Sequence, residues 1–182
     1  MRALQGILAL LLLASSTPAQ EPAKASVLKK GARVAIAGDS ITQQKLYSKY
    51  IETYLTVCLS DLELHVIQLG WSGETAPGFA NRMNNDLMPW KPDVVTTCYG
   101  MNDGSYRAYE ESIGKRYAGA MADIVGRLKK AGATVVVGGP GVVDSKFFQG
   151  GGEKPKVYNN NLQQLSNLAK KLAEENGFPF AD

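Results

Sequence analysis

The chain has 182 residues, of which 45% are hydrophobic and 20% charged, a balance typical of a globular protein and not of a disordered or fibrous one. Twenty Lys and Arg against 17 Asp and Glu leave a formal charge of +3, which is too weak a field to recruit nucleic acid or an anionic membrane. With two cysteines and one histidine, the sequence has no zinc-type ligand cluster, and we expect neither a metal nor another cofactor.

Residues 1–20 have the pattern of a secretory signal peptide. Arg2 provides a positive start, residues 7–14 form a short apolar run, and small residues at 17–19 offer a cleavage point. A helix that spans a bilayer needs about 20 apolar residues, so this run predicts no stable membrane insertion. Residues 21–32 are predicted to be a linker, and we expect the protein to be secreted or periplasmic.

Five short runs rich in β-branched and apolar residues predict β-strands, because each is entered from a polar or Gly/Pro segment. They cover residues 33–37, 62–69, 93–98, 134–137 and 178–181.

The sequence contains two cysteines. Cys58, on a predicted helix, and Cys98, in the third strand, are interpreted as small buried apolar residues, and a disulfide between them stays open.

Apolar residues at helical spacing predict helices between these strands. The helices lie within residues 46–58, 113–128 and 162–176. Strands that alternate with helices form βαβ units, so the sequence predicts one α/β domain over residues 33–182, a three-layer α/β/α sandwich around a parallel sheet. The glycine-rich stretch at residues 138–155 has two possible interpretations, a substrate flap or a plain loop.

Three polar, glycine-bearing loops follow the first three predicted strands, at residues 38–42, 70–75 and 100–103. Ligands of open parallel sheets bind beyond the carboxyl ends of the strands. We therefore expect the three loops to converge on one ligand site.

These loops contain the groups needed to attack a carbonyl. Ser40, at the start of a helix, is placed to act as a nucleophile, and its amide is among the unpaired N–H groups of a helix N-terminus. Gly73 has no side chain to block its N–H, and Asn102 adds an amide donor, so the three together would form an oxyanion hole. Taken singly, each residue also fits a structural role: Ser40 an N-cap, Gly73 a turn and Asn102 an Asx-turn.

In combination, the three loops resemble the sequence blocks of the SGNH hydrolases, also called GDSL esterases and lipases. The resemblance implies a flavodoxin-like five-stranded sheet of order 2-1-3-4-5, with Ser40 as nucleophile and with Gly73 and Asn102 joining the Ser40 amide in the oxyanion hole. It extends over nearly all of the chain after the leader and rests on Gly38-Asp39-Ser40, Ser72-Gly73-Glu74-Thr75 and Gly100-Met101-Asn102-Asp103.

One block of that family, the Asp-x-x-His that supplies the catalytic base, is absent from the 182 residues. His65 does not replace it, because it lies in the second predicted strand, roughly 16 Å from the active edge at about 3.3 Å per residue. Two interpretations stay open. The domain is C-terminally truncated, which we expect, or the protein is a degenerate member without a base.

The resemblance implies a serine ester hydrolase that forms an acyl-enzyme on Ser40. The expected substrate is an acyl ester, either of a small molecule or of a carbohydrate such as a polysaccharide. Activity of the 182-residue form depends on the missing base, and the alternative is a non-catalytic binding module that keeps the cleft. Trp71, Tyr106 and Arg107 either line an acyl or sugar pocket or are solvated loop residues.

Overall fold

The computed structural model describes residues 27–182. The predicted signal peptide and the first residues of the predicted linker lie outside the described residues. The last residues of the linker are part of the folded domain, because Leu28 packs against a core cluster and the Gly31 N–H donates to the Leu62 carbonyl at 2.7 Å.

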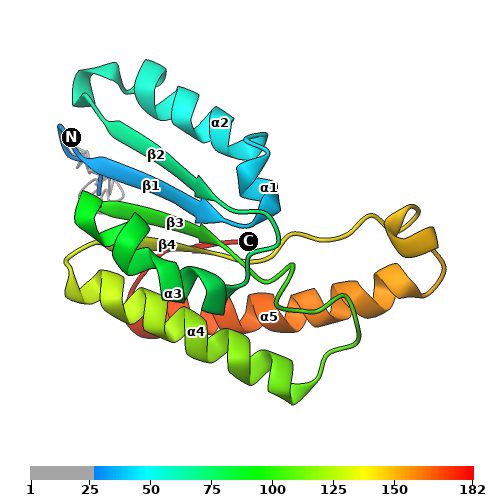
Figure 1. Cartoon of the computed structure of the whole chain (residues 1–182). Helices are drawn as coiled ribbons and strands as arrows, with labels where there is room; N and C mark the ends of the chain where they lie inside the picture. The colour runs from blue at the N-terminus through cyan, green and yellow to red at the C-terminus, as the bar shows by residue number, and fades with distance from the viewer. Residues whose placement is uncertain (1–26) are drawn as a thin grey trace, which may run out of the picture.

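A five-stranded parallel sheet of order β2-β1-β3-β4-β5 forms the centre of the molecule, which confirms the predicted fold class and strand order (Figure 1). Since β1 lies between β2 and β3, the loops that follow these three strands are neighbours at one edge of the sheet. The strands are β1 (Arg33–Gly38), β2 (His65–Gly70), β3 (Val94–Cys98), β4 (Thr134–Gly138) and β5 (Phe180–Ala181).

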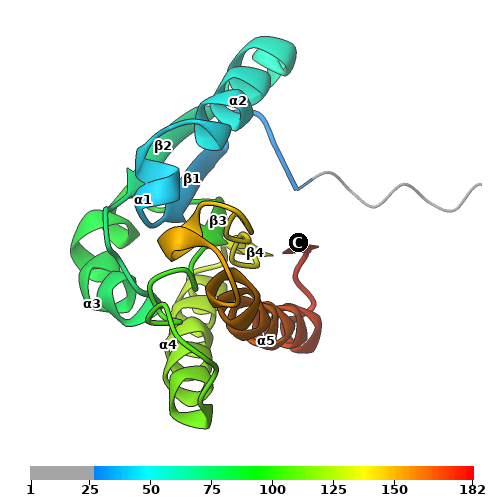
Figure 2. The same ribbon diagram turned by 90° about the vertical axis from the view of Figure 1, so that its right-hand side faces the viewer.

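Helices cover both faces of this sheet, as Figures 1 and 2 show. The α-helices are α1 (Ser40–Gln43), α2 (Tyr47–Thr53), α3 (Ala76–Asp86), α4 (Glu111–Lys130) and α5 (Lys154–Asn176). A π-helical turn, η1 (Tyr54–Cys58), continues α2, and three short 3₁₀ turns are η2 (Ser60–Leu62), η3 (Met88–Trp90) and η4 (Phe148–Gly150). In the described part of the chain, no helix has the length and apolar character of a bilayer span.

Alternation along the strands divides the core between the two faces. Ala35, Val95 and Val135 stand opposite one another in the sheet and belong to the large cluster packed under α3, α4 and α5. Val34 and Val94 face the other way, into a smaller cluster that includes Leu55 of η1. The alternation accounts for the three-layer arrangement.

Four details differ from the sequence predictions. Helix α3 was not predicted. The predicted helix at residues 46–58 ends as an α-helix at Thr53 and continues as the π-helical turn η1. Strand β2 starts at His65 and not at residue 62, because residue 62 belongs to the 3₁₀ turn η2. The prediction that Cys58 is buried is wrong, since Cys58 is exposed at the end of η1, and both cysteines are free thiols.

Candidate active site

The first loop places Ser40 directly after β1, as the first residue of α1 and only partly buried. Asp39 caps this helix, because its Oδ1 accepts the Ile41 N–H at 2.9 Å and its side chain is 1% exposed. The structural role considered for Ser40, that of the N-cap, is therefore filled by its neighbour. The Ser40 amide is at the N1 position, where a helix provides no internal acceptor.

Gly38 is required because α1 folds back onto the end of β1. A Cβ atom at Gly38 would lie 2.0 Å from Thr42 Oγ1 and 3.0 Å from the Cys98 carbonyl oxygen. Any side chain here would push α1, and Ser40 with it, away from the sheet edge.

The second loop is tied to the first through the backbone, since the Trp71 N–H donates to the Gly38 carbonyl at 3.0 Å. Gly73 has a φ of +72° with no atom within 4 Å of an added Cβ, so glycine is favoured here by backbone conformation and not by lack of space. The turn role and the oxyanion role of Gly73 are thus compatible: the turn exposes the residue at the sheet edge.

The buried side chain of Glu74 anchors this second loop to the neighbouring elements. Its carboxylate is almost fully buried and accepts Arg82 Nε at 2.5 Å and Nη2 at 2.6 Å, a two-point ion pair, while the Tyr99 hydroxyl donates to it at 3.0 Å. Arg82 Nη2 also donates to the Leu69 carbonyl at the end of β2 at 2.8 Å. The loop that contains Gly73 is therefore held to β2, to α3 and to Tyr99, the residue directly after β3.

The third loop joins the other two. Asn102 Nδ2 donates to the Glu74 carbonyl at 2.9 Å and makes a longer 3.5 Å contact with Asp39 Oδ2. Asn102 therefore touches the residue before Ser40 and the residue after Gly73, so the structure brings the three predicted site residues together. Its side chain reaches across to other loops, which excludes the simple Asx-turn considered for it.

Burial shapes the electrostatics of the two aspartates in these loops. Loss of hydration, with a smaller contribution from the nearby Glu74 carboxylate, raises the pKa of Asp39. Asp103 is fully buried, and burial raises its pKa to about 6 even though it accepts the Ala76 N–H at 3.0 Å. That hydrogen bond fixes the third loop to the first turn of α3.

His65 is remote from these loops. It is exposed, it is the first residue of β2, and it pairs with Arg33, the first residue of β1, whereas Gly38 and Gly70 pair at the other end of the strands. Since His65 is the only histidine of the sequence, the described residues place no imidazole next to Ser40. Residues 27–182 also contain no group of three or more His, Cys, Asp or Glu able to hold a metal ion.

Of the three residues suggested as pocket lining, two lie close to the site. The exposed Trp71 ring lies against Arg82, with the guanidinium carbon 5.4 Å from its centroid. The Tyr106 hydroxyl donates to Asn102 Oδ1 at 2.7 Å. Arg107 forms an exposed ion pair with Glu110 at 3.4 Å, so it fits the solvated interpretation.

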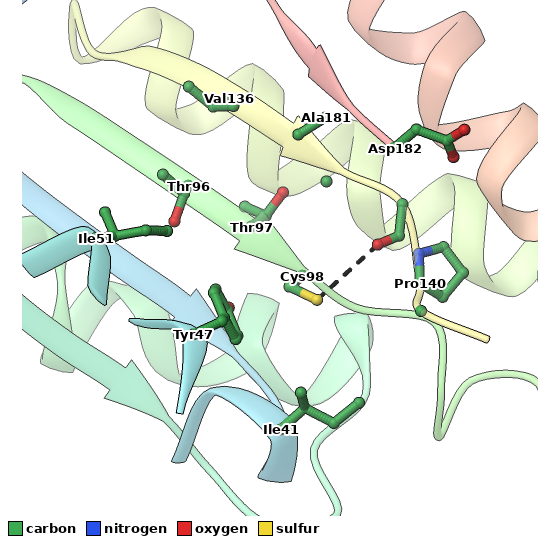
Figure 3. Close-up of a pocket in the computed structure, with 13 residues that line it drawn as sticks. Ile41, Tyr47, Ile51, Thr96, Thr97, Cys98, Val136, Pro140, Ala181 and Asp182 are labelled. Atoms are coloured by element: carbon green, nitrogen blue, oxygen red, sulfur yellow. Dashed lines mark hydrogen bonds between the residues drawn. The ribbon is translucent and has the colours of Figure 1, made fainter. Parts of the chain in front are cut away.

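An apolar cleft of about 360 Å³ opens at Ile41, the residue after Ser40, between α1–α2 and the strands β3, β4 and β5 (Figure 3). Ile41 and Tyr47 line one side and Asp182 lies on the other, where its carboxylate accepts the Ser166 hydroxyl at 3.3 Å. The Cys98 thiol lies on the floor, 3.9 Å from the Gly139 carbonyl. Burial raises the pKa of this thiol to about 11, so it stays protonated at neutral pH and does not compete with Ser40 as a nucleophile.

Sequence reasoning missed the groups that support the three loops. Phe79, Met83 and Leu87 recur at intervals of four after Thr75, which is the signal that could have identified α3. The bonds from Arg82 and Tyr99 to Glu74 had no such signal, because they join residues of different elements, 8 and 25 positions from Glu74.

The chain was compared with known families and proteins. Residues 36–182 match the model of the GDSL-like Lipase/Acylhydrolase family, a span that includes all three loops. The chain belongs to this family. Its members are lipases and acylhydrolases, so the family assigns the chain to the carboxylic ester hydrolases. A search of curated proteins found no match.

Several solved structures share the fold of this family member. The acetylxylan esterase Axe2 from Geobacillus stearothermophilus superposes with a TM-score of 0.74 at 20% identity, over 86% of this chain and 78% of Axe2. A gut microbial diltiazem-metabolizing enzyme gives 0.74 at 23% identity, over 85% of this chain and 37% of its own. LAE5, an alpha/beta hydrolase enzyme from the metagenome of Lake Arreo, Spain, gives 0.71 at 19% identity, over 86% and 78%.

Proposed function

We propose that this protein is a serine ester hydrolase that forms an acyl-enzyme on Ser40. The observation that carries the proposal is the Asn102 amide, which contacts the residue before Ser40 and the residue after Gly73. These contacts support the proposal, because they join the loops of the nucleophile and of the two further donors at the carboxyl edge of the sheet, where ligands of such sheets bind.

The chemistry follows from these positions. Ser40 Oγ attacks the ester carbonyl carbon, and the carbonyl oxygen becomes an oxyanion that accepts from the amides of Ser40 and Gly73 and from Asn102 Nδ2. The carbon–oxygen bond to the alcohol then breaks, and the alcohol leaves with the proton that Ser40 has lost. Water attacks the acyl-enzyme in the same way, which releases the acid and restores Ser40.

Asn102 has a hydrogen available for this role. One Nδ2 hydrogen is used by the Glu74 carbonyl at 2.9 Å, whereas the other makes only the 3.5 Å contact with Asp39. Loss of one oxyanion donor typically costs on the order of 3 kcal/mol of the reaction barrier, so Asn102 would contribute substantially to the rate.

We further propose that the substrate is a small or carbohydrate-linked acyl ester and that the protein acts outside the cytoplasm. The predicted signal peptide supports the location. The fold neighbours include an acetylxylan esterase, and the exposed Trp71 ring next to the Gly73 loop provides a surface on which a sugar ring can pack. Catalytic mutants of that esterase are known in which a Ser, an Asp or a His is replaced by Ala.

Hydrolysis of a short-chain aryl ester by the full chain tests the nucleophile. Ser40→Ala is expected to lower kcat by roughly 10³-fold or more, because it removes the oxygen that forms the acyl-enzyme. Ser60→Ala, on the exposed turn η2, is the matched control and is expected to keep full activity. Undiminished turnover by Ser40→Ala would show that Ser40 is not the nucleophile.

A second candidate function is a binding module that retains an ester without hydrolysing it. It is favoured by one observation: among residues 27–182, no imidazole lies next to Ser40 to accept its proton. The same assay separates the two functions. Release of many equivalents of product per protein molecule would reject the binding module, and retention of an acetylated oligosaccharide without any release would support it.

A further inference from the structure

We infer that Tyr106 is a positioning residue that holds the Asn102 amide in the orientation required of an oxyanion donor. The inference rests on the proposed function, in which Asn102 Nδ2 donates to the reacting oxygen. Tyr106 follows the third loop, four residues after Asn102. Its hydroxyl donates to Asn102 Oδ1 at 2.7 Å and so acts on the reaction only through Asn102.

The hydrogen bonds on the two ends of the amide are complementary. An amide oxygen can only accept and an amide nitrogen can only donate. The Tyr106 hydroxyl provides a donor on the Oδ1 side, and the Glu74 carbonyl provides an acceptor on the Nδ2 side at 2.9 Å. If the amide rotated by half a turn, Oδ1 would face the Glu74 carbonyl oxygen, and two acceptors would be opposed.

The backbone near Tyr106 adopts a conformation that residues with a side chain rarely adopt. Ser105 and Tyr106 have φ values of +57° and +55°, two successive left-handed residues directly after the third loop. This turn brings the chain back on itself, so that the ring of Tyr106 reaches the side chain four residues earlier. Conformations of this kind persist where the surroundings enforce them, and they cluster at functional sites.

Helix α5 enforces this turn. Asn161 Nδ2, on a fully buried side chain, donates to the Gly104 carbonyl at 2.9 Å and to the Arg107 carbonyl at 2.8 Å. The Tyr158 hydroxyl donates to the Met101 carbonyl just before Asn102. The turn is therefore held on both sides by residues one helical turn apart on α5.

A stack of aromatic rings fixes the side chain of Tyr106 itself. The ring centroid of Tyr106 lies 5.2 Å from that of Tyr158 and 6.2 Å from that of Phe148, and Phe148 stacks on Tyr158 at 5.4 Å. Phe148 belongs to the glycine-rich segment at residues 138–155, which the sequence analysis interprets as either a substrate flap or a plain loop. In the structure, this segment contributes to the wall that supports Tyr106.

The hydroxyl also remains a donor over the physiological range of pH. Partial burial, together with the Asp39 carboxylate, raises the pKa of Tyr106 above its usual value near 10. A protonated phenol next to Oδ1 is the state that the amide orientation needs.

Tyr106→Phe tests the inference, because it removes the hydroxyl and keeps the ring in its stack. The expected result is a roughly tenfold lower kcat, the effect of about one hydrogen bond, with KM changed by less than about twofold. The matched control is Tyr50→Phe, an 80% exposed tyrosine on α2. In an Asn102→Ala background, Tyr106→Phe is expected to have no further effect. An additive loss in that background would overturn the inference, and so would an unchanged kcat in the single variant.

A second readout needs no turnover. In ¹H–¹⁵N spectra of the full chain, the side-chain amide pair of Asn102, assigned by its loss in Asn102→Ala, is expected to shift and to exchange faster with solvent in Tyr106→Phe, but not in Tyr50→Phe. An amide pair that is unchanged in Tyr106→Phe would overturn the inference. If the wild-type protein hydrolyses no ester while the pair shifts as expected, the proposed function fails and the positioning role stands.

Discussion

Three buried carboxylates lie directly behind the candidate oxyanion hole, and each is compensated in a different way. Asp39 caps α1, Glu74 is paired with Arg82, and Asp103 accepts a backbone N–H of α3. Buried carboxylates are costly unless they are paired or hydrogen-bonded, so each of them ties its loop to a specific donor elsewhere in the fold. The positions of the three loops that contain the candidate site residues are thereby fixed relative to the rest of the fold.

Asp103 is expected to make the stability of the fold depend on pH. Its pKa is about 6 in the folded chain against 3.8 for a free side chain, so the folded state binds this proton more tightly than the unfolded state. Its contribution to stability is therefore present below about pH 4 and is lost as the pH rises towards about 6, by at most roughly 3 kcal/mol. Relative to Asp103→Asn, the wild type should lose this amount between pH 4 and pH 6.5 in urea titrations.

Asp61→Asn, on the exposed turn η2, is the control for this prediction. Its free energy of unfolding should run parallel to that of the wild type over the same range of pH. If Asp103→Asn also runs parallel to the wild type, Asp103 does not retain its proton in the folded state.

At the scale of elements, α3 connects the second loop to the core. Thr75 caps it by accepting the Gly78 N–H at 3.3 Å, and Pro77 lies in its first turn, where no internal hydrogen bond is lost. Its buried side chains, Phe79 and Met83, pack in the large cluster under the sheet. The position of Gly73 and Glu74 therefore depends on the packing of this helix.

Truncation of Met83 measures this packing. Met83 is fully buried, so Met83→Ala is expected to lower the free energy of unfolding by about 2–5 kcal/mol, the usual cost of a large-to-small change in a core. Asn81→Ala, on the exposed face of the same helix, should change it by less than about 0.5 kcal/mol. Similar values for the two variants, measured by denaturant unfolding, would show that α3 contributes little to the core.

At the scale of the whole molecule, the strand order assembles the site. Since β1 is flanked by β2 and β3, three loops separated by up to about 60 residues of sequence meet at one edge, and the Asn102–Asp39 contact spans 63 positions. No single loop contains the nucleophile and all three donors, because Gly73 and Asn102 follow other strands than Ser40. The chemistry proposed here is therefore a property of the sheet topology.

Export is the prediction that belongs to the whole chain. When the protein is expressed with its own leader in a bacterial host, the exported form is expected to begin near residue 21, as predicted from the apolar run and the small residues after it. N-terminal sequencing and intact mass of the exported protein measure this. Leu11→Arg, which interrupts the apolar run, should leave the protein unprocessed, whereas Leu11→Ile should not. An exported protein that retains Met1 would contradict the prediction.

The patterns that the sequence revealed most clearly are those that depend on neighbours along the chain. Runs of β-branched and apolar residues predicted all five strands, and the apolar periodicity predicted most of α4 and the second half of α5. Helix α3 was missed although Phe79, Met83 and Leu87 have helical spacing, because the polar residues around them weaken the pattern. The π-helical turn at Tyr54–Cys58 has no recognisable sequence pattern, and the prediction that Cys58 is buried is therefore wrong.

For the site, the sequence by itself determined which residues are candidates, since Ser40, Gly73 and Asn102 each follow a strand within a recognisable motif. Only the tertiary structure decided how they are held: by Arg82 and Tyr99 on Glu74, by α3 on Asp103, and by Tyr106 on Asn102. The physical reason is the range of the interactions. Strand and helix patterns arise from residues two to four positions apart, whereas Tyr99 and Glu74 are 25 positions apart and Ala76 and Asp103 are 27. Tyr106 is only four residues from Asn102, but the turn that brings them together is held by Asn161 of α5, which comes much later in the chain.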